Sequence, residues 1–252
     1  MRRIRWPTCI VVCIEGPGEF NFLLDVAVLG DSVLYVADPD NRRVTFFDVE
    51  SAAYLHSISD MPAQRYRITR GGRAYWLGTS FRDALLYGTS REGEEAHLFG
   101  TLTKDQTRAH KGLFDGRIVT YGEHMIHVLF RYPIIIQYDS TGSVIYARGT
   151  PDLGQVDMPQ LNRIPTGGGL FAARVSGRAI NRHGELYGDE LVVHSRPTGS
   201  TRAFDLYDAA TGDYKSSIAV SWRRTRFANY DPIRERMWQV KDSTVVVYAV
   251  DR

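Results

Sequence analysis

The feature that most constrains this chain is a strand–turn–strand pattern that returns along its length. In "DSVLYVADPDNRRVTFFD", residues 31–48, an apolar run meets a cluster of Asp, Pro and Asn, and a second run follows and ends at Asp48. Short runs rich in Val, Tyr and Phe, bounded by such turn residues, are typical of paired β-strands. A chain that repeats this unit is expected to build an array of similar sheets.

The unit recurs at an interval that suits one particular architecture. Four clear copies and one weaker copy have first strands that begin near Val33, Ala74, Ile126, Leu191 and Met237. The spacings are 41, 52, 65 and 46 residues. This is about the period of a four-stranded propeller blade with insertions of variable length.

A further candidate strand precedes each pair, and sustained helical periodicity is absent. These strands are Asp25–Leu29, Tyr66–Arg70, Leu113–Tyr121, Ala179–Leu186 and Phe227–Tyr230. We predict an all-β chain that forms a single β-propeller domain over residues 1–252, with four-stranded antiparallel blades. Five blades are favoured over six, because "TPDLGQVDMPQLNRIPTGGGLF" (150–171) shows no second strand pair. Its segment "PTGGGLF" is interpreted as a loop between blades.

One end of the chain has a spare strand and the other end lacks one. The last unit lacks a fourth strand, while a spare strand, Thr8–Ile14, precedes the first unit. We expect this strand to complete the C-terminal blade and close the ring, which protects two sheet edges. The same run has no small-residue cleavage site after it, so we interpret it as a strand and not as a signal peptide. The compartment stays open, and an extracytoplasmic one would follow from a different assignment of the N-terminus.

Turn chemistry supports the hairpins. "FDVES", "YDSTG" and "YDAATG" occupy the same slot, and their aspartates, Asp139 and Asp208 among them, can accept hydrogen bonds from backbone amides further on. Asp38 and Asn41 are interpreted in the same way, as parts of a turn and not of a ligand loop. Cys9 and Cys13 would lie about 13 Å apart in one strand, too far to bridge, so we expect two buried thiols.

The segment that begins at "GPGEF" and continues through "DVAVLGDSVLYVADPDNRRVTFFD" resembles the NHL repeat and related bacterial six-bladed propellers. The matching positions cover residues 16–60 and weaken in later units. They are Gly18, Phe20, Tyr35, Val36, Ala37, Asp38, Asn41, Arg42 or Arg43, Val44, Phe47 and Asp48. The resemblance implies a propeller, and the family usually has six blades. In a propeller the innermost strands line the central channel, where we expect a ligand or partner to bind.

Composition and motifs exclude several function classes. The net charge of +2 provides no general field for nucleic acid or an anionic membrane, and "WRRTRF" alone does not make a basic stripe. No run of 18 apolar residues could span a membrane. Phosphate-binding glycine loops and nucleophile elbows are absent. The seven histidines form no two-histidine motif on one element, so we predict no metal site and no cofactor.

Arginines near the expected innermost strands provide the candidate site. Three of them come from different units and have amide or imidazole neighbours; the predicted ligand-binding residues are Arg67, Asn181, Arg182, His183, Arg226 and Asn229. Guanidinium groups that converge in this way would bind a carboxylate, sulfate or phosphate. The alternative is that these arginines point outward or pair with acids such as Asp25 and Glu185.

The sequence therefore favours a monomeric, non-catalytic binding propeller whose partner is a protein or a small anionic ligand. A propeller hydrolase or lyase with a site in the central channel is the alternative, and enzymatic activity is left open. A structural module of a larger chain is the third class. The fold alone does not decide among the three classes, because one fold can host many functions.

Overall fold

The structure is a computed structural model, and every regular element among the residues that it describes is a β-strand. The described residues are 20–21, 25–61, 63–78, 86–89, 97–98, 115–151, 161–167, 170–175, 179, 181–195, 201–221, 227–241 and 244–250. The chain divides into two compact units, residues 1–99 and 100–252, and each is described by itself. No helix among the described residues is long and apolar enough to cross a membrane.

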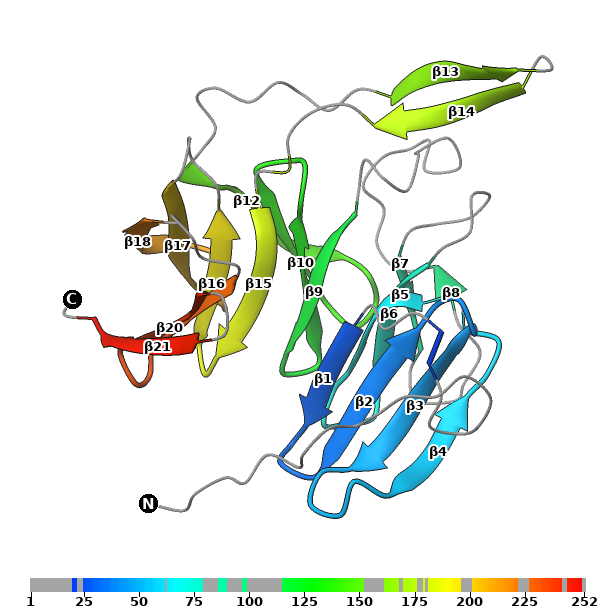
Figure 1. Cartoon of the computed structure of the whole chain (residues 1–252), viewed down its shortest axis with the longest axis horizontal. Helices are drawn as coiled ribbons and strands as arrows, with labels where there is room; N and C mark the ends of the chain where they lie inside the picture. The colour runs from blue at the N-terminus through cyan, green and yellow to red at the C-terminus, as the bar shows by residue number, and fades with distance from the viewer. Residues whose placement is uncertain are drawn as a thin grey trace. The chain divides into compact units, whose positions relative to one another are not determined.

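The first unit contains two four-stranded antiparallel meanders (Figure 1). The first sheet consists of β1 (Asp25–Leu29), β2 (Val33–Asp38), β3 (Arg43–Asp48) and β4 (Tyr54–Ile58). The second sheet consists of β5 (Ala63–Ile68), β6 (Ala74–Gly78), β7 (Leu86–Gly88) and β8 (His97–Leu98). Aromatic rings fill the space between the two sheets: Tyr35 and Tyr66 meet edge to face with ring centroids 5.5 Å apart, and both are fully buried.

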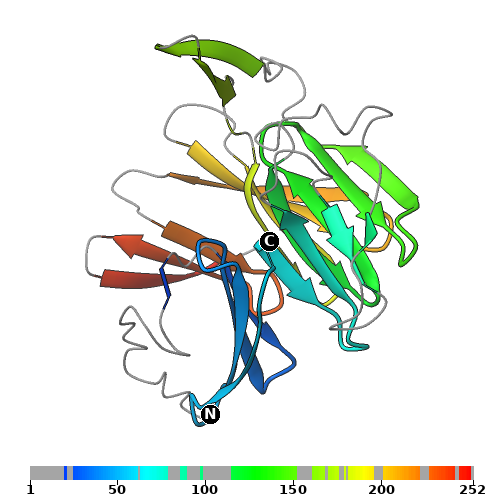
Figure 2. The same ribbon diagram turned by 90° about the vertical axis from the view of Figure 1, so that its right-hand side faces the viewer.

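The second unit contains three meanders and one separate hairpin (Figure 2). The four-stranded sheets are β9 (Gly116–Tyr121), β10 (His124–Leu129), β11 (Ile134–Tyr138), β12 (Val144–Gly149), and β15 (Asn181–Tyr187), β16 (Glu190–Ser195), β17 (Thr201–Asp208), β18 (Tyr214–Ser221). The third sheet has β19 (Phe227–Asp231), β20 (Arg236–Lys241) and β21 (Thr244–Ala249), and the hairpin is β13 (Leu161–Gly167) with β14 (Leu170–Val175).

The five meanders confirm the predicted all-β, five-bladed propeller fold, and each blade begins within a few residues of its predicted place. Innermost strands of successive blades contact each other within each unit, β1 with β5 and β9 with β15. The expected closing strand, Thr8–Ile14, lies outside the described residues, so its pairing with β21 and the single closed ring stay predictions.

The interpretation of "PTGGGLF" as a loop was wrong, and so was the absence of a strand pair in this region. Residues 165–167 end β13 and residues 170–171 begin β14, in an antiparallel hairpin. The register shifts between Pro165 and Gly167, which is how a strand accommodates a residue without an amide donor. Two strands make a hairpin and not a sixth blade.

Side-chain and backbone bonds close the turns as predicted. One carboxylate oxygen of Asp139 accepts the amides of Thr141 and Ser143 at 2.8 and 2.9 Å, and one of Asp208 accepts those of Ala210 and Thr211 at 3.0 and 3.1 Å. The carboxylate of Asp38 accepts the backbone and side-chain N–H groups of Asn41, at 3.2 and 2.7 Å. These carboxylates therefore close turns, and the predicted site residues lie on or near the innermost strands.

Candidate ligand site on the innermost strands

Arg67, a predicted site residue on β5, forms a buried ion pair with Asp25 of the neighbouring innermost strand, β1. Its Nη1 lies 2.5 Å from Asp25 Oδ2, and its Nη2 lies 3.3 Å from Oδ1. The exposed fractions of the two side chains are 8% and 1%. Burial lowers the pKa of the Arg67 guanidinium, but the charge and hydrogen bonds of Asp25 outweigh it, so the net direction is upward. The positive charge of Arg67 is therefore neutralised within the fold by the Asp25 carboxylate.

The other predicted site residues belong to the second unit, and all of them except Arg226 are among the described residues. The role of Arg226 stays a prediction. Asn181, Arg182 and His183 lie on β15, and Asn229 lies on β19, which are the innermost strands of two successive blades. The pairing of Arg67 with Asp25 follows the alternative that the sequence left open, and Arg67 is not carried further into the site.

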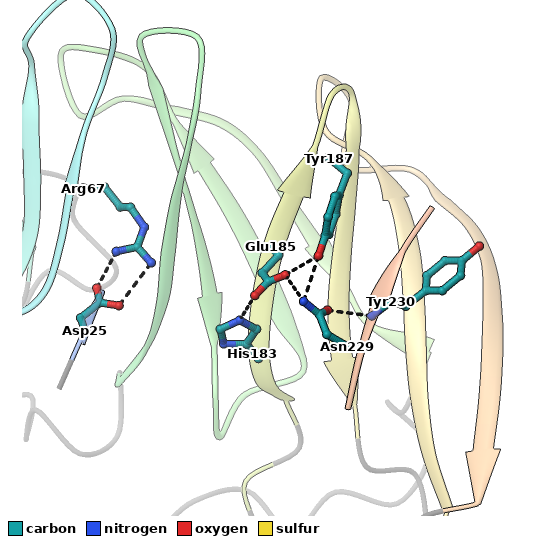
Figure 3. Close-up of polar contacts among 7 residues, drawn as sticks. All are labelled: Asp25, Arg67, His183, Glu185, Tyr187, Asn229 and Tyr230. Carbon is teal, nitrogen blue, oxygen red and sulfur yellow. Dashed lines mark hydrogen bonds and ion pairs between the residues drawn. The ribbon is translucent and has the colours of Figure 1, made fainter. Parts of the chain in front are cut away.

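A carboxylate that the sequence named only as an arginine partner organises this part of the molecule (Figure 3). Glu185 Oε1 lies 2.6 Å from Nε2 of His183, while its Oε2 accepts the Tyr187 hydroxyl and the Asn229 Nδ2 group, both at 2.6 Å. Asn229 Nδ2 also donates to the Tyr187 hydroxyl at 2.9 Å. We call these four residues the Glu185 network.

Strand alternation explains why one face of β15 carries the network. Residues 183, 185 and 187 share a face, since successive side chains in a strand point to opposite sides. The residues between them, Gly184 and Leu186, face the hydrophobic core. Leu186 packs in the cluster that joins this blade to the preceding one, and an added Cβ at Gly184 would lie 2.8 Å from Val128. The sequence "NRHGELY" thus combines one packed face with one polar face.

The network fixes the charge of Glu185. Burial raises the pKa of its carboxyl, but the hydrogen bonds and charge of His183, with the bonds from Tyr187 and Asn229, outweigh burial and lower that pKa well below its usual range. Burial and the neighbouring carboxylate raise the pKa of the Tyr187 hydroxyl. Glu185 is therefore an anion whose charge is largely satisfied by its three donors.

A second imidazole stands beside the network. His194 on β16 is directly opposite His183 in the strand register, and the ring centroids lie 5.0 Å apart with 62° between the planes. Burial, and then the positive charge of His183, lower the pKa of His194 to about 3; the charge of Arg117 acts in the same direction. His194 is thus a neutral side chain at neutral pH.

Only a few side chains of the site are exposed to solvent. The His183 and Glu185 side chains are 23% and 29% exposed, and Arg182, which precedes His183 in the strand, is exposed. Nδ1 of His183 has no partner among the described residues, and no dashed line reaches it in Figure 3. Asn181 is fully buried and donates its Nδ2 group to the carbonyl oxygens of Leu129 and Tyr132, so it fastens β15 to the preceding blade.

Sequence reasoning missed Tyr187 and His194, and it gave Glu185 only a secondary role. The alternation His183–Glu185–Tyr187 was a signal that could have found the first. Among the described residues, no group of three or more His, Cys, Asp or Glu side chains could hold a metal ion. The arrangement as it stands offers hydrogen bonds and charge to a ligand.

Comparisons with known proteins support the fold but do not indicate a function. No known protein family matches the chain, and no curated protein does. A member of the DUF4221 family from Bacteroides vulgatus is similar in structure, with a TM-score of 0.58, 8% identity, and coverage of 96% of this chain and 81% of that one. Hydrazine synthase of Kuenenia stuttgartiensis is similar with a TM-score of 0.53 and 13% identity over 92% of this chain. The chain spans only 58% of the length of that enzyme chain.

Proposed function

We propose that this chain is a non-catalytic binding propeller that holds a ligand or partner through an anionic group on the innermost strands of its second unit. The observation that carries the proposal is that exposed Arg182 directly precedes part-exposed His183 in β15, the strand that also carries Glu185 and Tyr187 of the Glu185 network. The relationship to NHL-type propellers, which rests on residues 16–60, belongs to the same proposal.

The balance of charge supports an anion. The negative charge of Glu185 is taken up by three donors, which hold it in place. Arg182 contributes a positive charge, Arg117 lies close enough to disfavour the protonated form of His194, and His183 adds a charge when it is protonated. A carboxylate or phosphate is the natural complement of guanidinium and imidazolium groups.

A melting experiment tests the small-molecule form of this proposal. A ligand that binds only the folded protein raises the melting temperature, so phosphate, citrate and a sulfated sugar are added to the chelator-treated protein at millimolar concentration. We expect at least one of them to raise the midpoint, with a smaller shift at high ionic strength because Coulomb attraction is screened. If none shifts the midpoint, the small-molecule form is wrong.

Variants assign the effect to the site. Arg182→Ala should abolish most of the shift, whereas Arg182→Lys should retain part of it, because lysine keeps the charge but loses the two-pronged geometry. Arg148→Ala is the matched control, since Arg148 is also exposed and sits on the outer strand β12, 3.5 Å from Asp213. An equal loss in Arg148→Ala would show that the anion binds non-specifically.

A propeller hydrolase or lyase is the second candidate, and one observation favours it. The Glu185 carboxylate holds His183 Nε2, which leaves Nδ1 available to accept a proton from a substrate, the usual arrangement of a general base and its orienting carboxylate. A panel of ester, glycoside and uronate substrates tests it. Turnover that His183→Ala abolishes would favour the enzyme, and no turnover on any substrate leaves the binding module.

A further inference from the structure

His183, which is part of the proposed anion site, forms a cross-strand pair with His194, which is not. They are directly opposite each other on β15 and β16. Their ring centroids are 5.0 Å apart. The two rings come from an innermost strand and its neighbour, which are rigid elements of one blade.

One nitrogen of His183 is engaged by a hydrogen-bonding partner. Its Nε2 lies 2.6 Å from the Glu185 carboxylate, so this nitrogen carries the proton and Nδ1 keeps a lone pair. Nε2 of His194 is buried and has no hydrogen-bond partner in the described part of the chain.

His183 has the hydrogen bonding that is usual for a metal ligand. A metal-ligating imidazole almost always donates its other N–H group to a carboxylate or carbonyl oxygen, which fixes the tautomer and the ring orientation. Glu185 is such a partner for His183. With a metal–nitrogen distance of about 2.1 Å, each ring centroid would lie roughly 3.2 Å from the ion. The observed separation of 5.0 Å then subtends an angle of about 100° at the ion, close to tetrahedral.

We infer that His183 and His194 form a two-histidine site for a divalent transition-metal ion such as Zn²⁺, Ni²⁺ or Cu²⁺. Two imidazole nitrogens suit these ions and not Mg²⁺ or Ca²⁺, which prefer oxygen. The inference goes beyond the proposed anion binding and does not depend on it.

Copper spectroscopy on the unaltered protein tests the inference directly. One equivalent of Cu²⁺ is added to chelator-stripped protein that carries ¹⁵N-labelled histidine, and the nitrogen couplings are read by electron paramagnetic resonance. We expect two imidazole nitrogens per ion. One nitrogen or none would overturn the site, and this measurement requires no variant to fold.

Calorimetric titration with Zn²⁺, Ni²⁺ and Cu²⁺ gives the affinities. We expect one ion per chain and the tightest binding for Cu²⁺. His183→Ala and His194→Ala should each remove one nitrogen coupling, and Glu185→Gln should weaken binding 10- to 100-fold while both couplings remain. His56→Ala is the control, because His56 is exposed on β4 of the other unit. Unchanged binding in both site variants would contradict the inference, whatever the anion panel gives.

Discussion

Two innermost-strand carboxylates, one in each unit, have opposite relations to their surroundings. Asp25 in the first unit forms an ion pair with Arg67, and both side chains are almost fully buried. Glu185 in the second unit binds three donors, yet its side chain and that of His183 are still about a quarter exposed. The first pair has satisfied its charges within the fold, while the second leaves a ring nitrogen available.

Burial is the difference by which we assign the Asp25 pair to the fold and the Glu185 network to the proposed site. A guanidinium that is buried against its own carboxylate offers little to a ligand, since binding would first have to break a pair that is expensive to break. A carboxylate that orients a part-exposed imidazole positions a group that a ligand can reach.

Removing the Asp25 carboxylate should produce the largest loss. Asp25→Ala leaves the Arg67 guanidinium buried without its partner, so we expect a decrease of about 3–5 kcal/mol in the free energy of unfolding. Urea denaturation measures it. Asp60→Ala is the control, because Asp60 pairs with Arg42 on the surface at 3.9 Å, and such pairs contribute about 0–1 kcal/mol. Equal effects of the two substitutions would show that the Asp25 pair is not special.

Neutralising Glu185 should cost less stability but more function. Glu185→Gln weakens the bonds from His183, Tyr187 and Asn229, and we expect a loss of about 1–3 kcal/mol in the free energy of unfolding. The anion-induced shift in melting temperature should change as well, because His183 loses its orienting carboxylate. A variant with wild-type ligand shifts and lowered stability would place the Glu185 network with the Asp25 pair, as a purely structural feature.

The turn aspartates bond to amides that are close in sequence, so we expect a small, local effect when one of them is removed. Asp208→Ala removes bonds to two backbone amides and should decrease the free energy of unfolding by about 1 kcal/mol. Ligand affinity should be unaltered, since the carboxylate closes a turn. Loss of binding at unchanged stability would show that this turn is a site.

Asp205 on β17 is a buried carboxylate that has no ion-pair partner among the residues that the structure describes. Ser217 donates to it, and burial raises its pKa while bonds from Ser195 and Ser217 offset part of the effect. A folded-state pKa above the unfolded value of about 3.9 means that the folded protein holds this proton more tightly. The stability from this group is therefore present at low pH and lost as the pH rises through the folded-state pKa.

Asp205→Asn tests this dependence by removing the titrating group. As the pH rises above the unfolded-state pKa of about 3.9, we expect the wild type to lose stability relative to the variant, with a slope of at most about 1.4 kcal/mol per pH unit. Urea denaturation at a series of pH values gives the slope. A wild type that gains stability relative to the variant over this range would show that the Asp205 pKa is lowered, as that of Glu185 is.

The parts of the molecule that could be predicted are those that local sequence determines. The turns at Asp139 and Asp208 depend on amides two to four residues away, and the hairpins that they close set the strand starts. The hairpin β13–β14 was missed because Pro165 and the glycines that follow read as a loop. Its strands pair around a register shift that no local pattern signals.

The site depends on contacts between residues distant in sequence, and these could be predicted only in part. The innermost-strand placement of Asn181, His183 and Asn229 followed from the repeat. The bond between Asn229 and Glu185 spans 44 residues, and the Arg67–Asp25 pair spans 42. Whether a charge is paired or available depends on such contacts, and a single sequence contains no record of them.

The central claim is that the ligand site lies on the innermost strands of the second unit and not at the buried pair of the first. Backbone amide NMR during titration with the anion that gives the largest melting shift tests it most directly. We predict that the chemical-shift changes concentrate at residues 181–187 and 229–230, with none at Asp25 or Arg67. Changes centred on Asp25 and Arg67, or spread evenly over the chain, would contradict the account.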